Sequence, residues 1–442
     1  MCQFCMSYER AGAGGSSGPE LRSPRRLKGW VYCVGENVGR DVELTVERMA
    51  HGGVAVGRLD GRVVFVSDAI PGETVLARIS DDRKKSFWRA DTVEVLEPSP
   101  HRRPHVWSAA GIEHAPGRRA GGAEFGHIAL AHQRELKRGI LTEALLRMAG
   151  VETEVEVAAL PGDDAADGLG WRTRIRLHVD DEGRLGPMAA RSHTIIPVTD
   201  APLATDTVQA ATPFGERFSG FDTVDVMAPN GGEPRLVIGE QKPTVIRERV
   251  GDRSFALDDT GFWQVHREAP TTLSHAVQEA IDADRFDPRA GNLDLYGGVG
   301  LLAAAVADRF GPSTRITSVE ADPRATDHAS ENLAEWVGAG AESGRVDRWL
   351  RALQERTAGD RSPLRGATVV VDPPRSGAGV DVMAALGRLA PAQIVYVACD
   401  PVALARDVAL AEAHGYRMTR IRAFDLFPHT HHVEAVASLV RE

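Results

Sequence analysis

The sequence is poor in cysteine and has no long apolar run. Four cysteines occur in 442 residues, and three of them, Cys2, Cys5 and Cys33, lie before residue 40. This grouping does not make a disulfide framework, and Cys2-x-x-Cys5 has no second pair at metal-ligand spacing, so we expect free thiols in a reducing compartment. No apolar run approaches the roughly 20 residues that span a bilayer, and no signal-peptide segment opens the chain. A cytoplasmic protein without membrane contact is predicted.

The sequence also lacks a basic excess. Its formal net charge of −10 argues weakly against a nucleic-acid partner. However, residues 1–150 contain 22 Lys and Arg against 18 Asp and Glu, and Phe87 and Trp88 interleave with one basic run. The clustered basic residues are Arg83, Lys84, Lys85, Arg89, Arg102, Arg103, Arg118, Arg119, Arg134, Lys137 and Arg138. They indicate either a local patch for a polyanion or ordinary solvated faces, and both interpretations stay open.

Composition and periodicity divide the chain into four parts. Residues 1–40, rich in Gly, Ser, Arg and Pro, predict a disordered tail. Residues 41–98 contain about five short alternating stretches broken by Gly turns, which is typical of a small OB-like β-barrel. Residues 99–254 predict a mixed α+β central domain, and residues 255–442 a catalytic domain.

Two features stand out in the central part, which is expected to be an RNA-binding domain. Residues 132–148 have the spacing of an amphipathic helix, with Leu136, Ile140, Leu141, Leu145 and Met148 on its apolar face. Residues 171–179 predict a strand with Arg172, Arg174 and Arg176 on one face. Those arginines indicate an RNA surface or, equally well, a solvated sheet face.

Strands and helices alternate from residue 291 onward. Strands are expected at 293–296, 316–320, 368–372 and 394–399, with helices reaching about residues 309, 332 and 389. This rhythm predicts a doubly wound parallel α/β sheet of the Rossmann type.

A cofactor site is predicted at the carboxyl ends of these strands. The first strand ends in the turn Asp294-Leu295-Tyr296-Gly297-Gly298-Val299-Gly300, whose glycines allow close backbone approach. Glu320 ends the second strand, where it could bind a ribose diol. The turn does not fit G-x-G-x-x-G, and the third strand ends in Asp372-Pro373-Pro374-Arg375, a turn typical of enzymes that methylate planar nitrogenous substrates. The pattern favours S-adenosylmethionine, with a dinucleotide as the alternative.

A candidate nucleophile and a candidate base follow. Cys399 ends a strand, a position where a cysteine is usually a small core residue, but it lies at the same sheet edge as the cofactor turn. Taken alone, Glu434 would be interpreted as a surface carboxylate. His429, His431 and His432 precede it, and a zinc site is disfavoured because no partner ligands are evident elsewhere.

These motifs together resemble the RNA uracil-5 methyltransferase family with an N-terminal TRAM domain, over nearly everything after residue 40. The motifs that carry the resemblance are Gly261 to His266, Asp294 to Gly300, Asp372 to Arg375, Tyr396 to Asp407 and Phe427 to Glu434. The resemblance implies S-adenosylmethionine bound by Gln264, Tyr296, Gly298, Glu320 and Asp372. It also implies Cys399 as the nucleophile and Glu434 as the proton acceptor.

Uracil chemistry explains these residue types. Carbon 5 is a poor nucleophile toward a sulfonium methyl group, but attack of a thiolate on carbon 6 makes an enolate that accepts the methyl at carbon 5. A carboxylate can then remove the carbon-5 proton, and elimination releases the cysteine.

Two departures from the family pattern stand out. Asp400 follows the nucleophile where the family usually has Asn. Many members hold an iron–sulfur cluster on a Cys-Gly-Gly-Cys segment and a later Cys-Pro-Leu. Here the matching segments are Ala120-Gly121-Gly122-Ala123 and Ala201-Pro202-Leu203, so no cluster and no other metal are expected.

The sequence thus predicts a monomeric 5-methyluridine methyltransferase that acts on RNA, with large-subunit ribosomal RNA favoured over transfer RNA. Two rivals stay open. A methyltransferase for an exocyclic base nitrogen would need the Asp-Pro-Pro turn but no cysteine. A catalytically idle RNA-binding factor would need neither nucleophile nor base.

Overall fold

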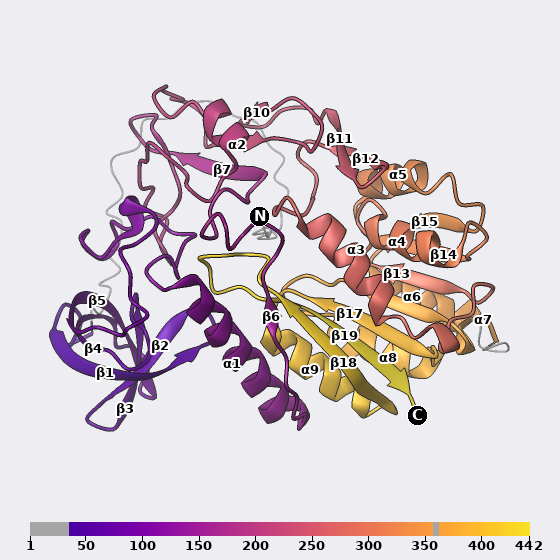
Figure 1. Cartoon of the computed structure of the whole chain (residues 1–442), viewed down its shortest axis with the longest axis horizontal. Coiled ribbons are helices and arrows are strands. Elements are labelled where there is room, and N and C mark those ends of the chain that lie inside the picture. Colours follow the sequence, from indigo (N-terminus) through magenta and orange to yellow (C-terminus); the bar gives the residue numbers. More distant parts are fainter. Residues whose placement is uncertain (1–34, 357–361) are drawn as a thin grey trace, which may run out of the picture.

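The computed structural model describes residues 35–356 and 362–442. Residues 1–34 of the expected tail, with Cys2, Cys5 and Cys33, lie outside this part. In Figure 1 the chain forms a barrel, an upper mixed region and a large sheet, with helix α1 between the barrel and the sheet. Within the described ranges, no helix combines the length and the apolar character needed to cross a membrane.

The barrel confirms the expected OB-like fold. Its five strands close in the order β1-β2-β3-β5-β4, with β3 and β5 parallel. Alternation in β1 buries Val42, Leu44 and Val46, because every second side chain points inward. Trp88, expected beside the surface basic run, is instead 8% exposed and belongs to the barrel core. The strands are β1 (Asp41–Ala50), β2 (Val54–Leu59), β3 (Arg62–Ser67), β4 (Thr74–Asp81) and β5 (Phe87–Glu97).

The large sheet confirms the Rossmann-like prediction. Its order is β15-β14-β13-β16-β17-β19-β18-β6, parallel from β15 to β17 and antiparallel at β19. The strands are β13 (Asn292–Leu295), β14 (Ile316–Glu320), β15 (Ala339–Ser343), β16 (Thr368–Val371), β17 (Gln393–Ala398), β18 (Tyr416–Phe424), β19 (Glu434–Arg441) and β6 (Val157–Ala158).

Helices cover both faces of this sheet. One face carries α3 (Ala269–Ala280), α4 (Leu301–Phe310) and α5 (Pro323–Asn332). The other carries α6 (Val346–Arg356), α8 (Gly379–Leu389), α9 (Pro401–Glu412) and α1 (Leu130–Ala149), while α7 (Ser362–Arg365) precedes β16. Apolar strands such as β16 and β17 are buried on both sides, as parallel strands under two helical layers must be.

The central segment is divided between two layers. A four-stranded sheet in the order β10-β9-β7-β8 forms the upper region with α2, and β11 pairs with β12. However, α1 packs on α9, and β6 joins β18 at the edge of the large sheet. The boundaries at 98 and 254 therefore stay predictions. The elements are α2 (Asp206–Ala211), β7 (Arg174–Val179), β8 (Leu185–Gly186), β9 (Thr223–Met227), β10 (Arg235–Ile238), β11 (Val245–Val250) and β12 (Arg253–Asp258).

Two expectations for the central segment need correction. Met148, assigned to the apolar face of α1, is 42% exposed and lies in the last turn of the helix, which ends at Ala149 and is capped by the left-handed Gly150. The arginines of β7 do not form one open row. Arg174 is buried and lies 3.6 Å from Glu248, while Arg176 pairs with Asp225 at 2.6 Å.

Candidate active site

A hollow of about 430 Å³, open solvent included, lies at the carboxyl ends of β13 and β16. Its lining residues are Phe262, Trp263, Gln264, Tyr296, Gly297, Gly298, Val299, Leu301, Leu302 and Asp372. Four of the five residues expected to bind the cofactor, Gln264, Tyr296, Gly298 and Asp372, therefore line the same hollow. The fifth, Glu320, lies behind the turn and accepts the backbone N–H of Gly298 at 3.1 Å.

The glycine turn requires its glycines for steric reasons. A Cβ at Gly297 would lie 2.0 Å from the Ser318 hydroxyl and 2.6 Å from the Asp294 carboxylate, so no other residue fits. Gly298 has φ +54°, and a Cβ there would meet nothing within 4 Å, so its backbone faces open space. Below the turn, burial raises the pKa of Asp294 to about 7, although its carboxylate accepts the N–H of Ala303 at 3.1 Å.

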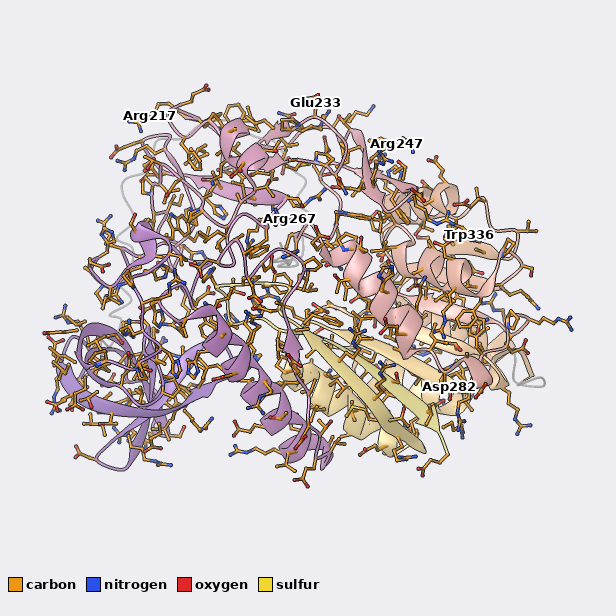
Figure 2. All side chains as sticks on the ribbon, viewed as in Figure 1. Arg217, Glu233, Arg247, Arg267, Asp282 and Trp336 are labelled. Carbon is orange, nitrogen blue, oxygen red and sulfur yellow. The ribbon has the colours of Figure 1, made fainter. Side chains whose placement is uncertain are left out.

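Several contacts from the central segment fix the loop that carries Gln264. Thr173 donates its N–H to the carbonyl of Val265 at 2.8 Å. His266 accepts the N–H of Glu268 at Nδ1, so its Nε2–H donates to Asp163 at 3.1 Å. Arg267, labelled near the centre of Figure 2, follows this motif and donates to the carbonyl of Gly170 at 3.3 Å.

The sheet register brings Cys399 and Glu434 to one edge. In the β17–β19 ladder, Val397 faces Val436 and Ala398 faces Ala435. Cys399 directly follows the last residue of β17, and Glu434 is the first residue of β19, so both lie next to this final pair of the ladder. Cys399 is half-buried, and Glu434 is 4% exposed. The register thus brings a thiol and a buried carboxyl group to the same end of the β17–β19 ladder.

Asp407 ties this edge to the start of α8, just after the Asp-Pro-Pro turn. One of its carboxylate oxygens accepts the Tyr396 hydroxyl at 2.5 Å and the N–H groups of Ala378 and Gly379 at 2.7 and 3.2 Å. The turn begins at Asp372, whose own N–H donates to the carbonyl of Leu295 at 3.1 Å. The cofactor hollow and the cysteine edge are therefore joined by short backbone links.

Helix α1 holds the loop that leads to Glu434. Lys137 is fully buried and donates to the Asp425 carboxylate at 2.5 Å and to the carbonyl of Phe427 at 3.0 Å. Gln133 accepts the N–H of His429 at 2.8 Å and donates to its Nδ1 at 3.0 Å. His429 Nε2 then donates to the carbonyl of Asp167 at 2.7 Å, and burial lowers the pKa of this histidine.

These positioning residues were missed from the sequence, where Lys137 was grouped with the surface basic residues. That assignment is wrong. A signal was available, because Gln133 and Lys137 lie one turn apart within the apolar stripe that contains Ile140 and Leu141. Polar side chains on a core-facing stripe need buried partners.

The other two histidines of the motif have separate contacts. His432 accepts a hydrogen bond from Arg375 at 3.0 Å, and burial lowers its pKa to about 2. His431 lies 3.6 Å from Glu124. The three histidines therefore point to different partners rather than to a common centre.

Asp400, which follows the candidate nucleophile, has two roles. One carboxylate oxygen caps α9 by accepting the N–H groups of Val402 and Ala403 at 3.0 and 2.8 Å. The other lies 3.2 Å from Nε2 of His51, in the turn between β1 and β2 of the barrel.

The three alanines at the cluster-ligand positions are buried. Ala120 and Ala123 pack in an apolar cluster with Trp107, Trp171 and Leu203, and Ala120 bridges to Ala189. Ala201 lies in the adjoining cluster. Ala120 and Ala123 also line a hollow that Asp68, His105 and Arg119 share.

Comparison with known proteins identifies the family. Residues 351–442 match the tRNA (Uracil-5-)-methyltransferase family, and residues 35–87 match the TRAM domain. An uncharacterized RNA methyltransferase of Streptomyces coelicolor is 37% identical over 91% of this chain and 93% of its own length. A 23S rRNA (uracil(1939)-C(5))-methyltransferase of Chromohalobacter salexigens, RlmD, is 32% identical over 90% of this chain and 89% of its own length.

A solved structure shares the fold. The tRNA (uracil-54, C5)-methyltransferase of Pyrococcus abyssi, in complex with S-adenosyl-L-homocysteine, has a TM-score of 0.64 at 23% identity. It covers 90% of this chain and 100% of its own. The carbon-5 specificity of the matched family excludes the exocyclic-nitrogen rival. The chain therefore belongs to the S-adenosylmethionine-dependent RNA uracil-5 methyltransferase family.

Proposed function

We propose that this enzyme methylates carbon 5 of a uridine in large-subunit ribosomal RNA through a covalent bond between Cys399 and carbon 6. The observation that carries the proposal is the β17–β19 register, whose last pair, Ala398 and Ala435, directly precedes Cys399 and follows Glu434 at the carboxyl end of β17. A thiol and a carboxylate are the nucleophile and base that carbon-5 alkylation of uracil requires.

The hollow fits S-adenosylmethionine. Gln264, Tyr296, Gly298 and Asp372 line it, and the backbone at Gly298 is open to a ligand. Each carboxylate oxygen of Glu320 accepts one backbone N–H, which leaves lone pairs for ribose hydroxyls. We assign these five residues to the cofactor, which supplies an electrophilic methyl group when bound.

The chain's own residues then act on uracil in sequence. The Cys399 thiolate bonds to carbon 6, and the electrons of the carbon 5–carbon 6 double bond move to form an enolate. Carbon 5 takes the methyl group, after which Glu434 removes the carbon-5 proton. The returning electron pair restores the double bond and breaks the carbon–sulfur bond. The uridine must leave its stack to reach Cys399, which favours a loop over a helix.

Trapping experiments test these roles. RNA that contains 5-fluorouridine should give a complex with the wild type that resists denaturation, since carbon 5 then has no proton to lose. Cys399→Ala should give no complex and no turnover while it still binds S-adenosylmethionine. Glu434→Gln should accumulate the same complex on ordinary RNA. Turnover of Glu434→Gln at the wild-type rate without a complex would remove Glu434 from the base role.

Ribosomal RNA is the favoured substrate because the Chromohalobacter relative, named for 23S rRNA, aligns over nearly the whole chain. Transfer RNA is the second candidate, since the family that matches residues 351–442 is named for it. Mapping 5-methyluridine in total RNA from a deletion strain decides between them. Loss of the base from transfer RNA alone would overturn the ribosomal assignment.

We further propose that the enzyme works without an iron–sulfur cluster. Alanine occupies three cluster-ligand positions, and Ala120 and Ala123 pack against tryptophans. Protein purified without oxygen should be colourless and free of iron and sulfide. Stoichiometric iron and sulfide would refute this.

A further inference from the structure

A turn of the barrel contacts the active-site edge. His51, Gly52 and Gly53 connect β1 to β2, and Nε2 of His51 lies 3.2 Å from Oδ2 of Asp400. Asp400 is bonded directly to Cys399. The N-terminal barrel thus reaches within one residue of the candidate nucleophile, although some 350 positions separate the two in sequence.

The same turn also contacts the loop that leads to the candidate base. A Cβ built at Gly53 would lie 2.7 Å from Cβ of His431, three residues before Glu434, and Gly53 has φ +72°. Only glycine permits this approach. The neighbouring Gly52 has φ +88°, but a Cβ there would meet nothing within 4 Å.

Asp400 can transmit an effect of the turn to the thiol. Its Oδ1 is used by the cap of α9, so its Oδ2 remains for His51. Helix α9 in turn carries Asp407, which holds Tyr396 and the start of α8. The cap, the Cys399 loop and the barrel turn therefore form one connected unit.

We propose that His51 is a positioning residue, which through Asp400 holds the barrel against the catalytic edge and fixes the Cys399 loop for attack on uracil. This inference rests on the proposed function, in which Cys399 is the nucleophile. Neither His51 nor Asp400 needs to touch the reacting atoms for this role.

The pair is charged over a limited pH range. The hydrogen bond that His51 donates to Asp400 raises the pKa of His51, against burial and the nearby positive charge of Arg375. The pKa of Asp400 is lowered by His51 and by the N–H groups of the cap, against burial. His431, paired with Glu124, lies across Gly53. The attraction is complete between about pH 4 and 6.5, and it is lost as pH rises through the raised pKa of His51.

Charge-changing variants test the proposal. Asp400→Asn keeps a capping oxygen but removes the charge, and His51→Gln keeps a donor without the charge. The rate of complex formation with 5-fluorouridine RNA below pH 6.5 should fall roughly fivefold in His51→Ala and in Asp400→Asn, and less in His51→Gln. The rate of complex formation in the double variant should fall no further than in either single variant. In the wild type the contribution of the charged pair to this rate should disappear as pH rises through the raised pKa of His51, and in the variants this pH-dependent contribution should be absent. Additive losses, or rates equal to wild type, would overturn the proposal.

The glycines supply a matched steric pair. Gly53→Ala and Gly52→Ala both strain a backbone with positive φ, but only the first intrudes on His431. Gly53→Ala should slow complex formation several-fold more than Gly52→Ala, with equal affinity for S-adenosylmethionine. Equal rates in the two variants would contradict close docking of the turn.

A binding-independent readout separates failure of this inference from failure of the proposed function. The titration of His51, followed by NMR in the free protein, should shift to lower pH in Asp400→Asn. If the wild type forms no 5-fluorouridine complex, the proposed function fails, and positioning for uracil attack fails with it. If the complex forms but the His51 titration does not respond to Asp400, only the inference is overturned.

Discussion

The two halves of the proposed active site are built differently. In the cofactor half, Asp294, Gly298, Ser318 and Glu320 come from β13, β14 and the turn between β13 and α4, and their hydrogen-bond partners lie within 24 positions in sequence. In the base half, the loop before Glu434 is held from α1, by contacts that span 288 to 296 positions. The glycine turn is therefore supported within one βαβ unit, although the loop of Gln264 is held from the central segment. The loop before Glu434 depends on α1 and on the barrel.

Removal of Lys137 is expected to have the largest effect, and it tests whether the loop before Glu434 can be disturbed without disturbing the cofactor hollow. Lys137→Met leaves Asp425 buried without its cation, which should cost about 3–5 kcal/mol of folding free energy. Denaturant unfolding measures the loss. In conditions where the variant is folded, it should bind S-adenosylmethionine normally but form the 5-fluorouridine complex slowly.

The matched control is Arg138→Met, one position along the same helix on its exposed side. It should change stability by less than about 0.5 kcal/mol. If both variants lower the free energy of unfolding equally, the buried Lys137–Asp425 pair does not stabilise the fold more than an exposed arginine does.

The pH dependence of folding stability tests the environment of Asp294, below the glycine turn of the cofactor hollow. Its pKa is raised to about 7 by burial, so the folded state holds a proton that the unfolded state has released above about pH 4. Stability contributed by this group should fall as pH rises from about 4 to 7, by at most about 1.4 kcal/mol per pH unit, and level off above. The stability difference between wild type and Asp294→Asn should follow that curve. A difference that is constant with pH would exclude a raised pKa.

Two alanine substitutions in the glycine turn are expected to have smaller effects that differ from each other. Gly297→Ala intrudes on Ser318 and Asp294 and should lower stability, whereas Gly298→Ala meets open space. The Gly298 variant should cost about 1 kcal/mol in backbone strain and weaken S-adenosylmethionine binding, with complex formation on saturating cofactor preserved. Calorimetric titration of both variants checks this. Unchanged cofactor affinity in Gly298→Ala would move the ligand away from the turn.

The smallest expected effect concerns RNA contacts of the barrel. Arg83 already pairs with Asp81 at 2.7 Å, while Lys84 and Lys85 are exposed. Neutralising both lysines should reduce the slope of log affinity against log salt by somewhat under one unit per residue. Methyl transfer on saturating RNA should not change. An unaltered slope would make this hairpin an ordinary solvated surface.

The same contrast explains what the sequence could predict. The strand at 316–320 was placed without error, because apolar runs and Gly turns are local signals. Strand β15, with the sequence Ala-Gly-Ala-Glu-Ser, was missed because it lacks an apolar pattern. The Lys137–Asp425 pair and the His51–Asp400 contact were not predictable, since no local pattern records which distant charge will face a side chain. Residue types at the site follow from chemistry, but their support depends on tertiary packing.

Strand β6 has a consequence for biosynthesis. It occupies the edge of the large sheet beside β18, so residues 157–158 find their partners only after residue 424 has been made. At typical elongation rates the wait is roughly tens of seconds. During that time α1 cannot cover α9, and the charge of Lys137 remains in water. The N-terminal barrel, whose strands all lie within residues 41–97, can close at once. Synthesis thus produces a folded barrel first, and the helix that holds the loop before Glu434 docks last.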